Sequence, residues 1–168
     1  MLAIVAALAI ILTACAPQAA AVPTKAIEPT MASTEATGAM PVTGEMTVNV
    51  SEAAEYGPIL VDDQGLSLYV FMHDTQNSGK STCTDADGCT KEWPPLLGQG
   101  SPVAGDGVDS SLLDTITRDD GTIQVTYNGW PLYHFDEDKT LGDTNGQGLN
   151  EFGGLWFLVS PAGEAIQE

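Results

Sequence analysis

The sequence predicts an all-β fold: one compact domain made of two related repeats, each with a β-hairpin, joined by long loops. The main evidence is an internal duplication, because residues 65–74 (GLSLYVFMHD) return as residues 129–138 (GWPLYHFDED). A second observation is the dipeptide Asn128-Gly129 between two β-rich runs, a strong hairpin signal because both residues tolerate positive φ. A third is the alternation of aromatic and branched residues, typical of strands.

The duplication also limits the chemistry that both repeats can share. Outside the ten-residue block, the matching pairs are Gly57 and Gly121, Ile59 and Ile123, Val61 and Val125, and Trp93 and Trp156. The residue types present in both copies are Gly, Leu, Tyr, Phe, Asp and Trp. This set contains neither a cluster of metal ligands nor a nucleophile with a base, so the sequence describes architecture better than activity.

Each repeat is predicted to begin with strand, turn and strand. The first hairpin is expected at 59–61 and 66–71, and the second at 122–127 and 130–135. Further strands are expected at 112–117 and 155–160, and a helical turn within 90–97 before Pro94-Pro95 forces extended chain. The polar stretches 74–92, 98–110 and 136–153 exceed the usual loop length, which suggests that they are functional or pinned.

The N-terminus is predicted to be an export signal over residues 1–14. The apolar run 2–12 is shorter than the roughly 20 residues that a membrane span needs, and fits the apolar core of a signal peptide. The segment Leu12-Thr13-Ala14-Cys15 resembles a bacterial lipobox, which implies that Cys15 becomes the lipidated first residue of the mature protein. The residue after the cysteine is Ala16 and not aspartate. By analogy with lipoprotein sorting in two-membrane bacteria, we therefore expect anchoring at the outer membrane or outer surface.

Residues 15–48 are expected to be the lipidated cysteine and a disordered Ala/Pro/Thr-rich linker, and residues 49–168 the duplicated domain. The repeats are placed at about 57–98 and 121–163. A repeat of about 45 residues is near the limit for folding alone, so the two should share one core. The chain has 5 basic and 23 acidic residues, and its net charge of −18 excludes nucleic-acid binding.

Two cysteines, Cys83 and Cys89, lie in the predicted exported domain. Nearby cysteines in an oxidising compartment usually pair, and closing this short loop should stabilise the fold by roughly 2 kcal/mol. Zinc would need about four ligands, and no histidine lies between these cysteines. We therefore expect a disulfide.

The chain resembles a known family, the bacterial predicted lipoproteins with a repeated Tyr-x-aromatic-x-x-Asp motif, or secreted repeat of unknown function. The resemblance covers about residues 55–163. It implies a lipid-anchored extracytoplasmic protein and carries over no catalytic residue. The motif residues are Tyr69, Phe71, Asp74, Tyr133, Phe135 and Asp138, with further similarity at Cys83, Cys89, 93–96, 127–132 and 142–148.

Tyr69 and Phe71 lie two apart on a strand and should share one face, with Leu68 and Val70 on the other. We expect both faces to be packed. The alternative is an aromatic binding surface, for carbohydrate for example, that also uses Trp93, Trp130 and Trp156.

Asp74 and Asp138 follow their strands by three residues, where aspartate usually caps a turn. An alternative is a Ca²⁺ site in the Gly-rich loop of the second repeat, formed by Asp136, Asp138, Asp143 and Asn145, since Ca²⁺ binds 6–8 oxygens. A third alternative uses paired carboxylates as acid and base, as in glycoside hydrolysis.

The two histidines, His73 and His134, are candidate ligands for a redox cofactor. If both repeats used such a ligand, the matching positions of the other repeat should also be histidine. The other repeat has Glu137 and Val70 at the matching positions, which argues against this. The favoured function is a lipid-anchored envelope protein that acts as a non-enzymatic binding or structural module, partnered by the membrane and an envelope complex. The alternatives are an accessory subunit of an envelope electron-transfer system and an envelope hydrolase.

Overall fold

The computed structural model describes residues 46–167 of the chain. The predicted signal peptide, the lipidation site Cys15 and most of the predicted linker therefore lie outside the described residues. Within the described part, no helix has the length and apolar character needed to cross a membrane.

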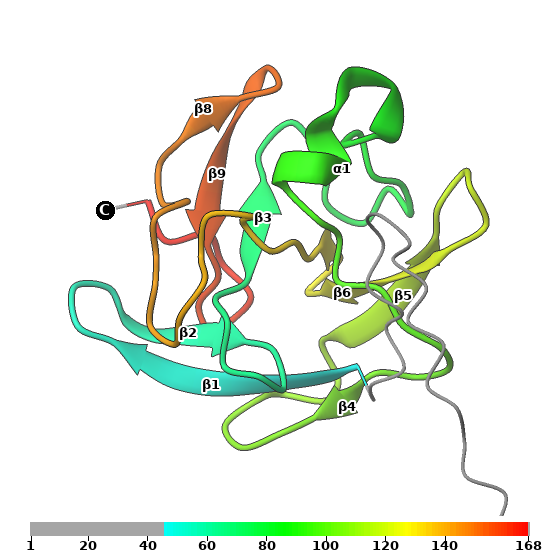
Figure 1. The fold of residues 1–168 in the computed structure, drawn as a ribbon. Coiled ribbons are helices and arrows are strands. Elements are labelled where there is room, and N and C mark those ends of the chain that lie inside the picture. Colours follow the sequence, from blue (N-terminus) through cyan, green and yellow to red (C-terminus); the bar gives the residue numbers. More distant parts are fainter. Residues whose placement is uncertain (1–45, 168) are drawn as a thin grey trace, which may run out of the picture. The chain divides into compact units, whose positions relative to one another are not determined.

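Strands dominate the fold and form three small sheets, which confirms the predicted all-β class (Figure 1). The sheet orders are β2-β1-β4, β3-β9-β8 and β5-β6-β7. Among residues 46–167, helix is limited to a 3-10 turn at Asp85–Asp87 and a short α1 at Cys89–Glu92. The strands are β1 (Thr47–Ala53), β2 (Gly57–Val61), β3 (Tyr69–Phe71), β4 (Val103–Ala104), β5 (Leu113–Thr117), β6 (Ile123–Tyr127), β7 (Trp130–Pro131), β8 (Asn150–Glu151) and β9 (Gly154–Leu158).

The domain begins earlier than the predicted boundary at residue 49. Strand β1 starts at Thr47, and the side chains of Met46 and Val48 are buried. These two apolar residues fall within the predicted linker, which rests on the Ala-, Pro-, Thr-, Ser-, Glu- and Met-rich composition of residues 16 to about 48. They pack instead into the core, since apolar surface removed from water stabilises the fold by about 25 cal/mol per Å².

The hairpins β1–β2 and β5–β6 occupy equivalent places, but with a register that the sequence match misses by one residue. Val50 pairs with Leu60 in the first hairpin, and Thr115 pairs with Val125 in the second. Leu60, and not Val61, is thus the counterpart of Val125, and both belong to the same buried cluster. The cause is the turn after β2, which is one residue longer than the Asn128-Gly129 turn after β6.

The two repeats meet where Tyr69 and Tyr133 pair with each other. The N–H of Tyr69 donates to the carbonyl of Tyr133 at 2.8 Å, and the N–H of Tyr133 donates to the carbonyl of Tyr69 at 3.0 Å. A residue that pairs reciprocally with its own counterpart defines a local two-fold relation. The repeats are therefore arranged as the two halves of a pseudo-symmetric pair.

Strands are exchanged across this pseudo-two-fold. Strand β3 of the first repeat pairs with β9 of the second, with Val70 opposite Phe157. In return, the N–H of His134 donates to the carbonyl of Pro94 in the first repeat at 2.8 Å. Each repeat thus completes the pairing of the other, as expected for copies that share one core.

The alternation of side chains along β3 supplies two buried clusters. Tyr69 and Phe71 point into one cluster with Trp93 and Trp156, while Leu68 and Val70 point into the other. All four β3-region side chains are at most 1% exposed. The predicted division of the strand into two packed faces is confirmed.

The long loops are held in different ways. A disulfide between Cys83 and Cys89, with Cα atoms 5.3 Å apart, closes the loop 74–92 and confirms the predicted pairing. The loop 98–110 contains β4, which pairs in parallel with β1, and the loop 136–153 contains β8, which pairs with β9. Neither of these two-residue strands was predicted.

Candidate functional site

The repeated motif forms a reciprocal network between the repeats. The Tyr69 hydroxyl donates to Oδ2 of Asp138, and the Tyr133 hydroxyl donates to Oδ2 of Asp74, each at 2.6 Å. The tyrosine of one copy therefore bonds the aspartate of the other. The hydrogen bonds of the motif therefore form only when both copies of the repeat are present.

Each motif aspartate is buried and accepts further hydrogen bonds. Oδ1 of Asp74 accepts from the N–H and the hydroxyl of Thr82, at 2.6 and 2.7 Å. Oδ1 of Asp138 accepts from the N–H and the side-chain amide of Asn145, at 2.9 and 3.1 Å. A buried carboxylate is tolerated only with such donors. The predicted capping role is thus extended, because each aspartate also fixes the loop that follows it in its own repeat.

The tyrosine hydroxyls stay protonated in this setting. Burial, then the hydrogen bond and the charge of Asp138, raise the pKa of Tyr69 far above its usual value. Burial, then the charge and the hydrogen bond of Asp74, raise the pKa of Tyr133 in the same direction. Both hydroxyls therefore remain donors over the whole physiological pH range.

Aromatic rings stack at the centre of the network. The rings of Trp93 and Trp156 are 3.9 Å apart and nearly parallel, and Phe71 stacks on Trp156 at 4.0 Å. Tyr69 meets the edge of Trp93, and Tyr133 meets the edge of Trp156. Because all of these rings are at most 1% exposed, they are packed as expected, and the alternative of an aromatic binding surface does not apply to them. Trp130 is only partly buried but packs against the other cluster.

A further buried carboxylate, Asp62, bonds across the two repeats without a symmetric counterpart, because Val70 stands at the position related to His134. Asp62 is 4% exposed and lies 3.0 Å from Nε2 of His134, and its Oδ1 accepts from the N–H groups of Gln64 and Leu66. Burial raises the pKa of Asp62, but the bonds to His134, Leu66 and Gln64 outweigh it and lower the pKa below its usual value. Asp62 was not among the predicted site residues, although its position before a Gly-containing turn suggests such an Asx cap.

The two histidines have separate roles. His134 bonds Asp62, whereas His73 is exposed and touches only the edge of the Phe71 ring among the aromatic contacts. Within residues 46–167, no three His, Cys, Asp or Glu side chains converge in a group that could hold a metal ion.

The residues of the predicted Ca²⁺ site are not assembled. Asp143 accepts from the N–H groups of Lys139 and Thr140, and Asp136 forms an exposed ion pair with Lys139 at 3.2 Å. Asp138 is turned into the core toward Tyr69 and Asn145. These carboxylates have separate partners, and among residues 46–167 they form no group that could hold a metal ion, so the geometry offers this Ca²⁺ prediction no support.

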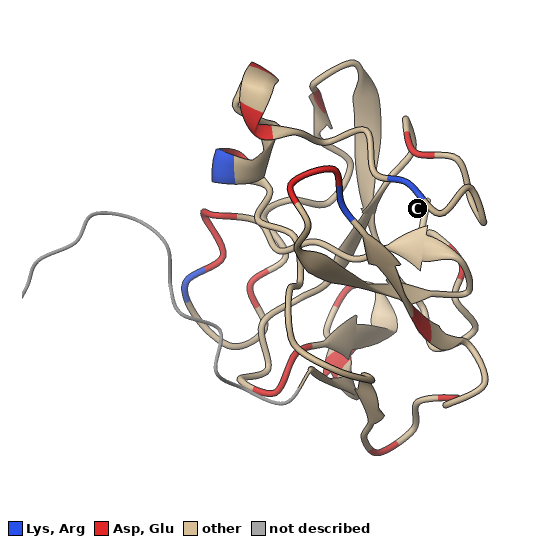
Figure 2. Ribbon diagram, turned by 90° about the vertical axis from the view of Figure 1, so that its right-hand side faces the viewer, with Lys and Arg blue, Asp and Glu red and all other residues tan. Residues whose placement is uncertain are grey.

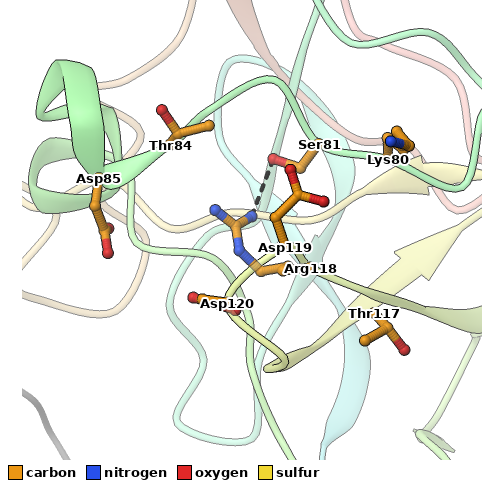
Figure 3. Close-up of a pocket in the computed structure, with 8 residues that line it drawn as sticks. All are labelled: Lys80, Ser81, Thr84, Asp85, Thr117, Arg118, Asp119 and Asp120. Atoms are coloured by element: carbon orange, nitrogen blue, oxygen red, sulfur yellow. Dashed lines mark hydrogen bonds between the residues drawn. The ribbon is translucent and has the colours of Figure 1, made fainter.

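A shallow polar pocket of about 160 Å³ lies outside this network (Figure 3). Arg118, the single arginine of the chain, donates to Ser81 at 3.0 Å and to Gln124 and the carbonyl of Cys83 at 2.6 Å. The Ser81 hydroxyl lies 2.7 Å from that of Tyr133. Hydrogen bonds therefore connect the pocket to buried Asp74. The pocket is lined by Lys80, Ser81, Thr84, Asp85, Thr117, Arg118, Asp119 and Asp120.

Acidic residues are spread over many loops of the domain, with few basic residues between them (Figure 2). Neighbouring acids affect one another where they gather. Burial, then the charges of Glu151, Glu137 and Asp136, raise the pKa of Glu92. The surface therefore presents a dispersed negative charge and not one localised acidic site.

Comparison with known proteins gives one match. Neither a curated protein nor a solved structure matches the chain. The family model described as a secreted repeat of unknown function matches residues 51–97 and again residues 114–160, which together make up more than half of the chain. These two segments contain the tyrosine, phenylalanine and aspartate of each motif copy. The chain therefore belongs to this family of secreted-repeat lipoproteins of unknown function.

Proposed function

We propose that the protein is anchored by lipid at Cys15 outside the cytoplasm, and that its domain is a rigid, non-enzymatic binding or structural module of the cell envelope. The observation that supports this most directly is the burial of all six motif residues. Their hydroxyl and carboxylate groups bond one another and the loops at Thr82 and Asn145, which supports a role in holding the domain together.

Hydrolysis by paired carboxylates has less support. Asp74 and Asp138 are 5% and 6% exposed, and each accepts three hydrogen bonds from fixed partners. A general acid or base must reach its substrate within hydrogen-bonding distance. The motif carboxylates lack that access, which favours a role in holding the repeats together.

The location is supported by the family and by the sequence before the domain. The lipobox-like Leu12–Cys15 segment implies acylation, and the Ala/Pro/Thr-rich linker would let the domain stand away from the membrane. The charge of −18 opposes adsorption to anionic lipid heads. We place the protein at the outer membrane or outer surface, with an envelope protein complex as its partner.

The anchor is tested by comparing wild type with Cys15→Ser in the native host. Wild type should fractionate with membranes and carry acyl groups by intact mass, whereas Cys15→Ser should be unacylated and leave the membrane. Membrane retention of an unacylated Cys15→Ser protein would refute anchoring. The module role is tested by chemical cross-linking in native envelopes: the anchored wild type should be recovered with an envelope protein, and recovery of wild type without any cross-linked partner would contradict the role.

A further inference from the structure

Four oxidisable side chains touch in series across the pseudo-two-fold. Ring centres are 5.4 Å apart from Tyr69 to Trp93, 3.9 Å from Trp93 to Trp156, and 5.1 Å from Trp156 to Tyr133. All four side chains are 0% exposed. Tyrosine and tryptophan lose a single electron more readily than other aromatic side chains. Rings at van der Waals separation exchange electrons efficiently, so these four form one electronically connected row.

Three members of the row bond a carboxylate through their acidic proton. Tyr69 donates to Asp138 and Tyr133 to Asp74, each at 2.6 Å. The indole N–H of Trp93 donates to Oε2 of Glu151 at 2.9 Å. One-electron oxidation turns a phenol or an indole into a strong acid, and an uncompensated positive charge is costly in a buried site. A carboxylate already in contact with the proton removes that cost.

Another tyrosine shows that packing alone does not require a carboxylate. Tyr127 is also 0% exposed, but its hydroxyl donates to the carbonyl of Pro161 at 2.8 Å and accepts from the N–H of Asp109. Neutral backbone groups are therefore sufficient to satisfy a buried tyrosine in this fold. The carboxylate partners are specific to the tyrosines of the row.

We propose that the row Tyr69–Trp93–Trp156–Tyr133 is a cofactor-free relay that accepts oxidising equivalents from one-electron oxidants outside the cytoplasm. In the forward step, a one-electron oxidant takes one electron from Tyr69 through Trp93 and is itself reduced by one electron. The O–H bond of Tyr69 breaks, and its proton moves to Oδ2 of Asp138. The products are a neutral tyrosyl radical and a neutral carboxylic acid, and a one-electron reductant returns the electron while the proton moves back.

The same step is available at Tyr133 and Asp74 because of the pseudo-symmetry. The row also approaches the surface at two places. Glu151, bonded to Trp93, is only partly buried, and the Tyr133 hydroxyl contacts Ser81, which bonds Arg118 in the surface pocket. An oxidant at the surface is thus separated from the row by a single layer of side chains. This activity is independent of the proposed module function and requires neither metal nor bound cofactor.

The chain offers a matched test because it contains only four tyrosines. Detergent-solubilised full-length lipoprotein is flashed with a ruthenium tris-bipyridine photo-oxidant and a sacrificial cobalt electron acceptor, and the tyrosyl radical is followed by transient absorption and electron paramagnetic resonance. One variant, Tyr56→Phe/Tyr127→Phe, keeps only the tyrosines of the row. The reciprocal variant, Tyr69→Phe/Tyr133→Phe, keeps only the other two.

The first variant should give a long-lived tyrosyl radical with the yield of wild type, and the second should lose that radical. Loss of the radical in Tyr56→Phe/Tyr127→Phe would overturn the proposal even if the reciprocal variant fails to fold. Asp74→Asn/Asp138→Asn should slow tyrosine oxidation about a hundredfold, the lower end of what a positioned base contributes, and should abolish its slowing in deuterium oxide. Unchanged rates in that variant would equally overturn it.

Discussion

At the scale of single residues, the main feature is a carboxylate placed inside an aromatic core. Asp74 and Asp138 would be strongly unfavourable there without donors, and each obtains one donor from the opposite repeat and two from its own loop. The sequence identified these residues by repetition. It could not show that their partners cross between repeats, because periodicity reports the face of a strand and not the element that covers it.

The Tyr69–Asp138 bond should contribute measurably to stability. Tyr69→Phe keeps the ring but removes one donor from a buried carboxylate, so we expect a loss of about 1–3 kcal/mol in the free energy of unfolding. Tyr127→Phe, which removes a bond to a neutral carbonyl, should cost about 1 kcal/mol. Urea unfolding of both variants measures the difference, and equal losses would show that the charged partner adds nothing.

Asp62 should make the domain sensitive to acid. Its pKa is lowered in the folded state, so its stabilisation is complete above the usual value of 3.8 and is lost as pH falls through the lower folded value. Asp62→Asn should therefore be less stable than wild type at neutral pH, and the difference should shrink below about pH 4. Thermal melts across this range test it, with exposed Asp63→Asn as the control. A constant difference at all pH values would contradict the assignment.

At the scale of elements, local signals predicted the β6–β7 hairpin and the helical turn. The first expected hairpin is reduced to a single bridge between Val61 and Ser67, because β2 pairs with β1, a strand that was not predicted. The Asn128-Gly129 turn is correct, with φ of 49° and 76°. The turn after β2 is one residue longer than the turn after β6. The sequence match therefore took Val61 as the counterpart of Val125, whereas the strand pairing shows that the counterpart is Leu60. Strand β4 has two residues and exists only because β1 lies beside it, so no local pattern could reveal it.

The disulfide should hold the loop that carries Thr82. Replacing both Cys83 and Cys89 with alanine should lower the free energy of unfolding by about 2 kcal/mol, from loop entropy alone. Hydrogen exchange should rise most in residues 75–88, since Thr82 anchors that loop to Asp74. The loop around Asn145, which lacks a disulfide, serves as the internal control. A uniform rise over both loops would show that the effect is not local.

At the scale of the whole molecule, neither repeat contains a complete core. Trp93 of the first repeat stacks on Trp156 of the second, and β3 pairs with β9. The small size of each repeat predicted a shared core. The exchanged strands show how the two repeats build this core together. The candidate site is thus a property of the interface between repeats.

Cutting the chain in the exposed segment between β4 and β5 should test this directly. Each fragment alone should be unfolded, because its motif tyrosine and aspartate lack their partners. Mixing the fragments should restore the near-ultraviolet circular dichroism of the stacked tryptophans in a concentration-dependent way. A single fragment that folds as a monomer with an ordered tryptophan would disprove the interdependence.

The reciprocal bonding of Tyr69 and Tyr133 has an evolutionary consequence. Contacts that relate each copy to its own counterpart are those of a symmetric homodimer, so an ancestral one-repeat chain could satisfy its motif by binding a second copy of itself. Joining two such copies in one chain removes the dependence of folding on concentration. It also frees the halves to differ: the Asp62–His134 bond has Val70 at the related position of His134, an asymmetry that two identical subunits could not have encoded.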